Sequence, residues 1–168
     1  MSKRRILLAA IVLGAAIAAY ALLLGPSDEQ RVRYQLTRLA TSLTVSDDTG
    51  TNPIAHLAHV NSEFAEIFDE DVRVHIPELT SLGQGRGELA RIAAQAPMQF
   101  RSLKVSFEDV SIKFDGSGRD AHVEATANLR ATRRDGGDAS DRRAVTFQAV
   151  KRDGSWRIST VQVWPSAG

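Results

Sequence analysis

The sequence predicts an α+β fold, in which three helices pack on a strongly curved antiparallel sheet, preceded by one N-terminal transmembrane helix. Residues 6–24 form an uncharged apolar run, and three segments between residues 28 and 96 repeat apolar residues at helical spacing. From residue 100 onward the apolar period changes to two, which is typical of strands. Helices grouped ahead of strands favour the α+β class, and a sheet curved round helices makes a cone with a cavity.

The apolar run is long enough to cross a membrane. As a helix, residues 6–24 would span about 28 Å, close to one hydrocarbon core. Lys3, Arg4 and Arg5 precede the run, so its N-terminus is expected in the cytoplasm and the rest of the chain outside, in the periplasm of a Gram-negative cell. A cleaved signal peptide is the alternative, since small-x-small sites end at Ala18 and Ala21. The length of the run favours the anchor.

The predicted organisation is a basic tip over residues 1–5, an anchor or uncleaved signal over 6–24, a hinge over 25–27 and one domain over 28–164. The absence of cysteine excludes disulfides and thiol chemistry. Without the three basic residues that precede the anchor, 18 Lys and Arg stand against 20 acidic residues. The exported part therefore has no basic surface typical of nucleic-acid binding. No cofactor is expected.

The predicted helices are marked by their caps. Ser27 and Gln30 form a capping box ahead of an apolar stripe at residues 32, 36, 39 and 43. Asn52 and Pro53 begin a second helix, whose predicted buried face comprises Ile54, Leu57, Phe64 and Phe68. A third helix follows a glycine-rich loop and is expected to end at Pro97. The glycines at 83, 85 and 87 suggest either a tight helix entry, which is favoured, or an anion site.

The predicted strands begin with a short one over residues 71–76, stopped by Pro77. Four more strands follow residue 100, and the first of them changes phase at Glu108–Asp109, as a β-bulge does. "RRDGGDASDRR" is expected to be a polar tip between strands, and "RDGS" supplies an Asp-Gly hairpin turn. Trp156 and Trp164, eight residues apart, would share one face of a regular strand.

This order of elements, with "IFDEDVRVHIP" ahead of "GQGRGELARIAA", resembles the nuclear transport factor 2-like superfamily over residues 28–164. That group includes ketosteroid isomerase and the SnoaL-like polyketide cyclases. The resemblance implies a cone fold but no single function, because the superfamily contains enzymes, small-ligand binders and non-catalytic interaction domains. An exported, anchored version also looks like the periplasmic assembly component of type IV secretion systems and mycobacterial accessory proteins of lipid importers. Those likenesses imply envelope protein partners, and the superfamily implies a possible homodimer through the open face of the sheet.

The resemblance implies that an enzyme of this fold would place a carboxylate base in the cone with a Tyr, Asp or His partner. Tyr34 is expected to face away from the core. Asp71 and His75 lie four residues apart on a strand and share one face. If that face looks into the cone, His75 is the acid–base candidate and Asp71 or Glu124 orients it; if not, all are solvated.

A polar row on the third strand is a second candidate site. It comprises residues 122, 124, 126, 128 and 130 and is either a solvated sheet face or the lining of a pocket or partner surface. The candidate ligand- or partner-binding residues are His122, Glu124, Asn128, Trp156 and Trp164. His56, His59 and Glu63 share one helix face that could hold a metal, but a solvated face is expected and no metal site is predicted.

The leading hypothesis is a non-catalytic, membrane-anchored extracytoplasmic domain that binds envelope proteins, or a small apolar ligand in its cone. The alternative is a small cyclase- or isomerase-type enzyme that uses His75 and Asp71.

Overall fold

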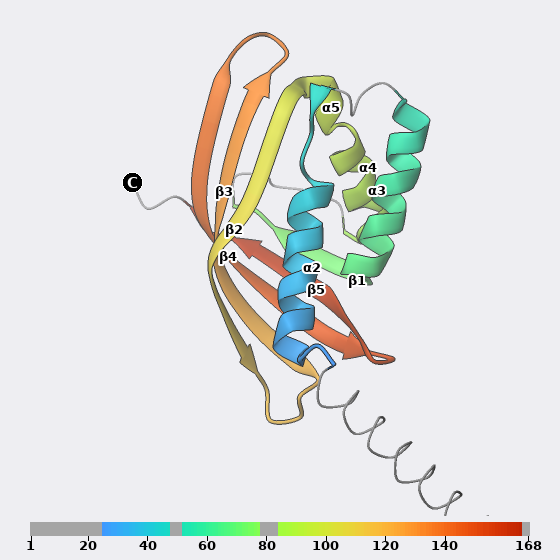
Figure 1. The fold of residues 1–168 in the computed structure, drawn as a ribbon, viewed down its shortest axis with the longest axis vertical. Coiled ribbons are helices and arrows are strands. Elements are labelled where there is room, and N and C mark those ends of the chain that lie inside the picture. The colour runs from blue at the N-terminus through green and yellow to red at the C-terminus, as the bar shows by residue number, and fades with distance from the viewer. Residues whose placement is uncertain (1–24, 48–51, 78–83, 166–168) are drawn as a thin grey trace, which may run out of the picture. The chain divides into compact units, whose positions relative to one another are not determined.

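The computed structural model describes residues 25–47, 52–77 and 84–165 (Figure 1). The described residues from Val32 onward belong to one compact unit. The predicted anchor at residues 6–24 lies outside the described residues. Within those residues, no helix has both the length and the apolar character needed to cross a membrane.

The three predicted helices are α2 (Asp28–Ser42), α3 (Pro53–Ile67) and α4 (Arg86–Ala94). The third ends before Pro97, and a short helix that was not predicted, α5 (Ala96–Gln99), follows it. The Ser27–Gln30 capping box is confirmed, because each backbone N–H donates to the other residue's side-chain oxygen, at 2.9 and 3.2 Å. Asn52 Oδ1 accepts from the N–H of Ala55 at 3.1 Å and caps α3, as predicted. Pro97 lies inside α5, near its start, where its missing N–H costs no helical hydrogen bond.

The buried face of α3 differs from the prediction. The structure buries Val60, Phe64 and Ile67, whereas Ile54 is 83% exposed and Leu57 is 40% exposed. At 100° per residue, Ile54 lies roughly 110° round the helix from the centre of the buried stripe, which explains its exposure. The stripe of α2 is confirmed, with Val32, Leu36 and Leu39 buried. Arg38 of α2 pairs with Glu63 of α3 at 2.9 Å.

The sheet has five strands in the order β1-β5-β4-β3-β2 and is mixed, so the expectation of a wholly antiparallel sheet was wrong. The strands are β1 (Phe68–His75), β2 (Phe100–Phe114), β3 (Asp120–Arg133), β4 (Asp138–Arg152) and β5 (Ser155–Val163). β1 pairs parallel with β5, and the other neighbours are antiparallel. The helices lie on one face of the sheet, and the main core fills the space between them (Figure 1).

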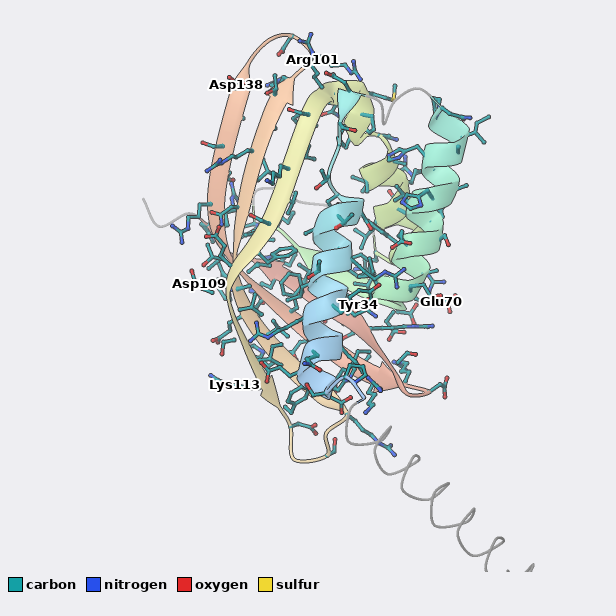
Figure 2. The ribbon with its side chains drawn as sticks, in the orientation of Figure 1. Tyr34, Glu70, Arg101, Asp109, Lys113 and Asp138 are labelled. Carbon is teal, nitrogen blue, oxygen red and sulfur yellow. The ribbon has the colours of Figure 1, made fainter. Side chains whose placement is uncertain are left out.

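A β-bulge in β2 is confirmed where it was predicted. Glu108 pairs with Thr126 and Ser111 with Glu124, so Asp109 and Val110 together oppose Ala125. Asp109 has φ 53, a left-handed conformation that Asp adopts more readily than most residues. It lies where β2 bends (Figure 2), as expected of a bulge.

The polar segment before residue 144 is strand and not only a tip. β4 begins at Asp138, and its residues 138–143 continue the pairing with β3, from Thr132 to Ala127. The turn itself is short and contains Gly136, with φ 96. Backbone pairing extends the hairpin regardless of side-chain polarity, because ladder hydrogen bonds use only main-chain groups. The Asp-Gly hairpin turn is confirmed by positive φ at both Asp153 and Gly154.

A second bulge separates the two tryptophans, so the prediction that they share one face was wrong. Gln148 pairs with Thr160 and Ala149 with Ile158, which leaves Ser159 as an extra residue in β5. One extra residue moves every later side chain to the opposite face. Trp156 is therefore 2% exposed in the core, and Trp164 is 46% exposed on the other side of the sheet.

Candidate functional site

A cavity of about 570 Å³ lies between the helices and the sheet. α2, α3 and α4 contribute one side of its wall, and β1 to β5 contribute the other. Its lining residues are Leu39, Leu43, Phe64, Phe68, Val74, Ile76, Leu89, Ile92, Ala93, Val105, Phe107, Ala127, Leu129, Asp141, Arg143, Val145, Phe147, Val161 and Val163. All but Asp141 and Arg143 are apolar.

Aromatic rings and small residues together shape the cavity. Phe64 and Phe68 meet edge to face with ring centroids 5.0 Å apart, and Phe107 and Phe147 do so at 5.3 Å. Such T-shaped pairs favour one ring orientation and add stabilisation beyond that of the buried area. Ala127 lies opposite Phe107 in the sheet register, and its methyl group leaves space that a larger side chain would fill.

The polar part of the wall is an ion pair on β4. Arg143 Nε donates to Asp141 Oδ2 at 2.6 Å, with the two side chains 25% and 40% exposed. Residues 141, 143, 145 and 147 alternate along the strand and point to the same face, which places this pair in line with Val145 and Phe147. The cavity thus combines a large apolar surface with one ion pair whose side chains can form hydrogen bonds with a ligand.

The predicted pair Asp71 and His75 lies elsewhere. Both side chains are exposed on β1, on the face opposite Val72, which is fully buried, and Val74, which lines the cavity. In the part of the chain that the structure describes, no hydrogen bond or ion pair joins Asp71 to His75. Their catalytic role stays a prediction, and a substrate of theirs would bind outside the cavity.

Tyr34, the other side chain weighed for a role in the cone, faces away from the core as predicted. It is 61% exposed on α2 (Figure 2), and the Arg38 guanidinium carbon lies 5.9 Å from its ring centroid.

Three of the five predicted binding residues meet on the sheet face opposite the cavity. His122 Nδ1 lies 2.8 Å from Gln148 Nε2, and His122 Nε2 lies 3.4 Å from Glu124 Oε1. Trp164 lines the same groove, and its Nε1 donates to Thr146 Oγ1 at 3.1 Å.

The other two predicted binding residues lie apart from this groove. Asn128 is further along β3, and its Nδ2 is buried without a hydrogen-bond partner among the described residues. Trp156 belongs to the core, where its ring packs against Phe114 at 5.5 Å and Lys151 Nζ lies 5.7 Å from it.

Two further patterns have structural explanations. The N–H of Gly85 donates to the carbonyl of Val72 at 3.0 Å, and Gly85 has φ 92, so this glycine fastens the entry of α4 to β1. On α3, Glu63 is engaged by Arg38, and burial, with a smaller effect of His59, lowers the pKa of His56. Over residues 25–47, 52–77 and 84–165, the structure contains no group of three His, Asp or Glu side chains arranged to hold a metal ion.

The sequence reasoning missed Asp141 and Arg143. They belong to a polar run that reads as a loop, and no apolar residue within it signals a strand. The available signal was periodicity: counting back by two from Phe147 and Val145 reaches 143 and 141. A hairpin with a shorter turn would have placed both on the cavity face.

The chain belongs to the SnoaL-like domain family, whose model matches residues 58–162. No curated protein matches the sequence significantly. Among solved structures, the chain is similar to the Kfla4162 protein from Kribbella flavida, with a TM-score of 0.66 and 13% identity over 83% of this chain and 90% of that one.

Two other similar structures have a TM-score of 0.61. One is a nuclear transport factor 2-like superfamily protein from Salmonella enterica, 18% identical over 83% of this chain and 91% of that one. The other is a putative scytalone dehydratase from Novosphingobium aromaticivorans, 17% identical over 81% and 82%. At these identities the likeness shows the fold alone, and the superfamily likeness drawn from the sequence is confirmed at that level.

Proposed function

We propose that this domain binds a small, largely apolar molecule reversibly in its cavity, without catalysing a reaction. The observation that carries the proposal is the cavity of about 570 Å³ in which one ion pair interrupts an apolar wall. Ligand sites typically have this size range and this composition, with a few polar groups that orient the ligand.

The volume sets the size of the ligand. At roughly 20 Å³ per atom and a packing density of about 0.74, the cavity holds about 20 non-hydrogen atoms. An efficiency of about 0.3 kcal/mol per atom then gives about 6 kcal/mol, or a dissociation constant of roughly 40 µM. Asp141 and Arg143 would orient one hydroxyl, carbonyl or carboxyl group of such a ligand, and the apolar wall would hold the rest.

A non-catalytic role is favoured by the chemistry of the wall. A cyclase or isomerase needs a base within hydrogen-bond reach of the bound substrate. Among the described lining residues, Asp141 is the only carboxylate, and it is engaged by Arg143. The competing proposal, an enzyme that uses His75 and Asp71, requires a substrate on the exposed face of β1. Binding in the cavity and catalysis at β1 are therefore separable by mutation.

A cavity-filling variant tests the proposal. The full chain, kept in a mild detergent, is titrated with 1-naphthol and with naphthalene by calorimetry. Ala127→Phe places a ring in the cavity and is expected to weaken the binding of both probes at least tenfold. Ala139→Phe, at an exposed position on β4, is the matched control and leaves binding within twofold of wild type. Equal affinity in wild type and Ala127→Phe, or no binding to wild type, would contradict the proposal.

We also infer from residues 1–24 that the chain is held in the cell membrane by residues 6–24, with the domain outside the cytoplasm, where its ligand would be exchanged with envelope proteins. Alkaline phosphatase, which is active only after export, is fused behind residue 168 to test this orientation. Phosphatase activity in the membrane fraction is expected. Activity in the soluble fraction alone would indicate a cleaved signal, and an inactive but intact fusion would indicate a cytoplasmic domain.

A further inference from the structure

A second concave site lies on the sheet face opposite the cavity, with a volume of about 480 Å³. It is lined by side chains of β3, β4 and β5 and by the residue that follows β5: His122, Glu124, Ala125, Ala144, Val145, Thr146, Gln148, Thr160, Gln162 and Trp164. We call it the outer groove. Its lining differs from that of the cavity, because six of its ten residues carry a carboxamide, hydroxyl, carboxylate or imidazole group.

The indole of Trp164 is held in place at the end of the outer groove. Its Nε1 donates to Thr146 Oγ1 at 3.1 Å, and its backbone N–H donates to the carbonyl of Ala144 at 2.9 Å. These two bonds fix both the chain and the ring. Because the ring is nonetheless 46% exposed, it offers a flat apolar surface to a ligand at little cost in side-chain entropy.

The polar groups stand in ordered rows beside this ring. The sheet register aligns Glu124 with Thr146 and Gln162 in one row, and His122 with Gln148 and Thr160 in the next. Neighbouring strands are about 4.8 Å apart, so each row presents hydrogen-bonding groups at close to the spacing of two equatorial hydroxyls on alternate carbons of a pyranose ring.

Contacts within and between these two rows order their side chains further. His122 contacts both Gln148 and Glu124, which restricts the rotamers of all three side chains.

The composition decides which ligand fits. The lining contains no Lys or Arg, so a phosphate or another anion would meet Glu124 without a compensating cation. Apart from Trp164, its apolar members are two alanines and a valine, so the indole is the one large apolar side chain that this lining offers to a ligand. A ring that is apolar on its C–H face and carries neutral hydroxyls round its edge matches both the indole and the polar rows.

We propose that the outer groove binds a neutral pyranose sugar, which stacks its C–H face on Trp164. Its hydroxyls exchange hydrogen bonds with Gln148, Gln162 and Glu124. By the packing density used above, the groove takes about 18 non-hydrogen atoms, or one pyranose ring and part of a second. This site is independent of the cavity and of its ligand.

The test uses the full chain in a detergent without a sugar headgroup, titrated with cellobiose, lactose and N,N′-diacetylchitobiose by calorimetry. At least one disaccharide is expected to bind, in the millimolar range. Trp164→Ala should weaken that binding at least tenfold, and Glu124→Gln about threefold. Trp164→Phe keeps an aromatic face and should retain most of it. Tyr34→Ala removes an exposed aromatic ring outside the outer groove and should leave the affinity within twofold.

Three results would overturn the proposal. The first is that none of the three disaccharides binds to wild type, and the second is that binding survives Trp164→Ala. The third is that the chain self-associates in sedimentation experiments and that Trp164→Ala abolishes this association, because the outer groove would then be covered by a second copy. Near-ultraviolet circular dichroism and 1-naphthol binding of each variant show that the fold and the cavity are intact.

Discussion

The Asp141 carboxylate accepts a 2.6 Å hydrogen bond from Arg143 Nε on the wall of an otherwise apolar cavity. Removal of one partner takes from the other charge a hydrogen bond that it makes beside apolar side chains. Removal of both substitutes an apolar surface, which proteins often tolerate well.

The first prediction is therefore that the losses of stability caused by substitutions at residues 141 and 143 do not add. Arg143→Leu should lower the free energy of unfolding by about 1–2 kcal/mol, less than for a fully buried pair because both side chains reach solvent. Asp141→Leu combined with Arg143→Leu should cost less than Arg143→Leu alone, as measured by urea unfolding. Arg91→Leu, which breaks an exposed pair with Glu88, should change the free energy of unfolding less than Arg143→Leu does. Additive losses at 141 and 143 would contradict this account. Wild type is expected to bind 1-naphthol more tightly than naphthalene, because the ion pair can bond its hydroxyl, and the double variant should lose this difference.

The second prediction concerns the bulge residue Asp109, with φ 53. Alanine tolerates this conformation poorly, so Asp109→Ala should destabilise the domain by about 1 kcal/mol, whereas Asp109→Gly should be close to neutral. Both variants lose the contacts of the carboxylate with Thr126 and Arg142, so their difference isolates backbone strain. Thermal unfolding measures it, with Asp120→Ala as a control at an exposed aspartate without positive φ. Equal losses at alanine and glycine would show that the carboxylate contacts matter instead.

The third prediction concerns the cap of α3. Asn52 Oδ1 accepts from the N–H of Ala55 at 3.1 Å, so Asn52→Ala should lower the free energy of unfolding by about 1 kcal/mol. Asn52→Asp restores an acceptor and adds a favourable charge at the helix N-terminus, so it should match or exceed wild type. Chemical denaturation checks both. An Asn52→Asp variant as unstable as Asn52→Ala would remove capping as the explanation.

The fourth prediction concerns acid stability at the turn after β2. Ser117 Oγ donates to the Asp115 carboxylate at 2.6 Å, and the N–H groups of Arg119 and Asp120 donate to it at 3.1 Å. These bonds, with the Ser117 hydroxyl first, lower the pKa of Asp115 from 3.8 to about 2. Because the folded pKa lies below the unfolded one, the stabilisation is present above about pH 4 and is lost as the pH falls towards 2.

Asp115→Asn should therefore flatten the fall in melting temperature between pH 4 and 2. Ser117→Ala should raise the Asp115 pKa, as followed by NMR titration of the carboxylate. An Asp115 pKa that is the same in wild type and Ser117→Ala would refute the assigned cause.

The features that the sequence predicts correctly are local ones. The Ser27–Gln30 box, the Asn52 cap, the bulge at Asp109 and the Asp153-Gly154 turn each depend on a few consecutive residues. The parallel pairing of β1 with β5 does not, because Phe68 and Ile158 meet only once the whole chain has folded.

For the candidate sites too, the sequence predicts what depends on neighbouring residues and misses what depends on the whole fold. A cavity between helices and a curved sheet follows from the element order, and the apolar positions that line it follow from periodicity. The sequence did not predict that Asp141 and Arg143 lie on a strand, because their segment has no alternation of apolar and polar residues. Trp164 was placed on the wrong face because the extra residue Ser159 leaves no clear mark in the sequence.

The Ser159 bulge also gives this chain two separate fluorescent reporters. Trp156 and Trp164 are its only tryptophans, one sealed in the core and one open to solvent. A buried indole emits at shorter wavelength than a solvated one, and small quenchers such as iodide reach only the solvated ring. The emission that iodide quenches in the native protein therefore comes from Trp164, and the protected emission comes from Trp156. A single spectrum can thus follow events on the outer face of the sheet and the integrity of its interior independently, with no added dye.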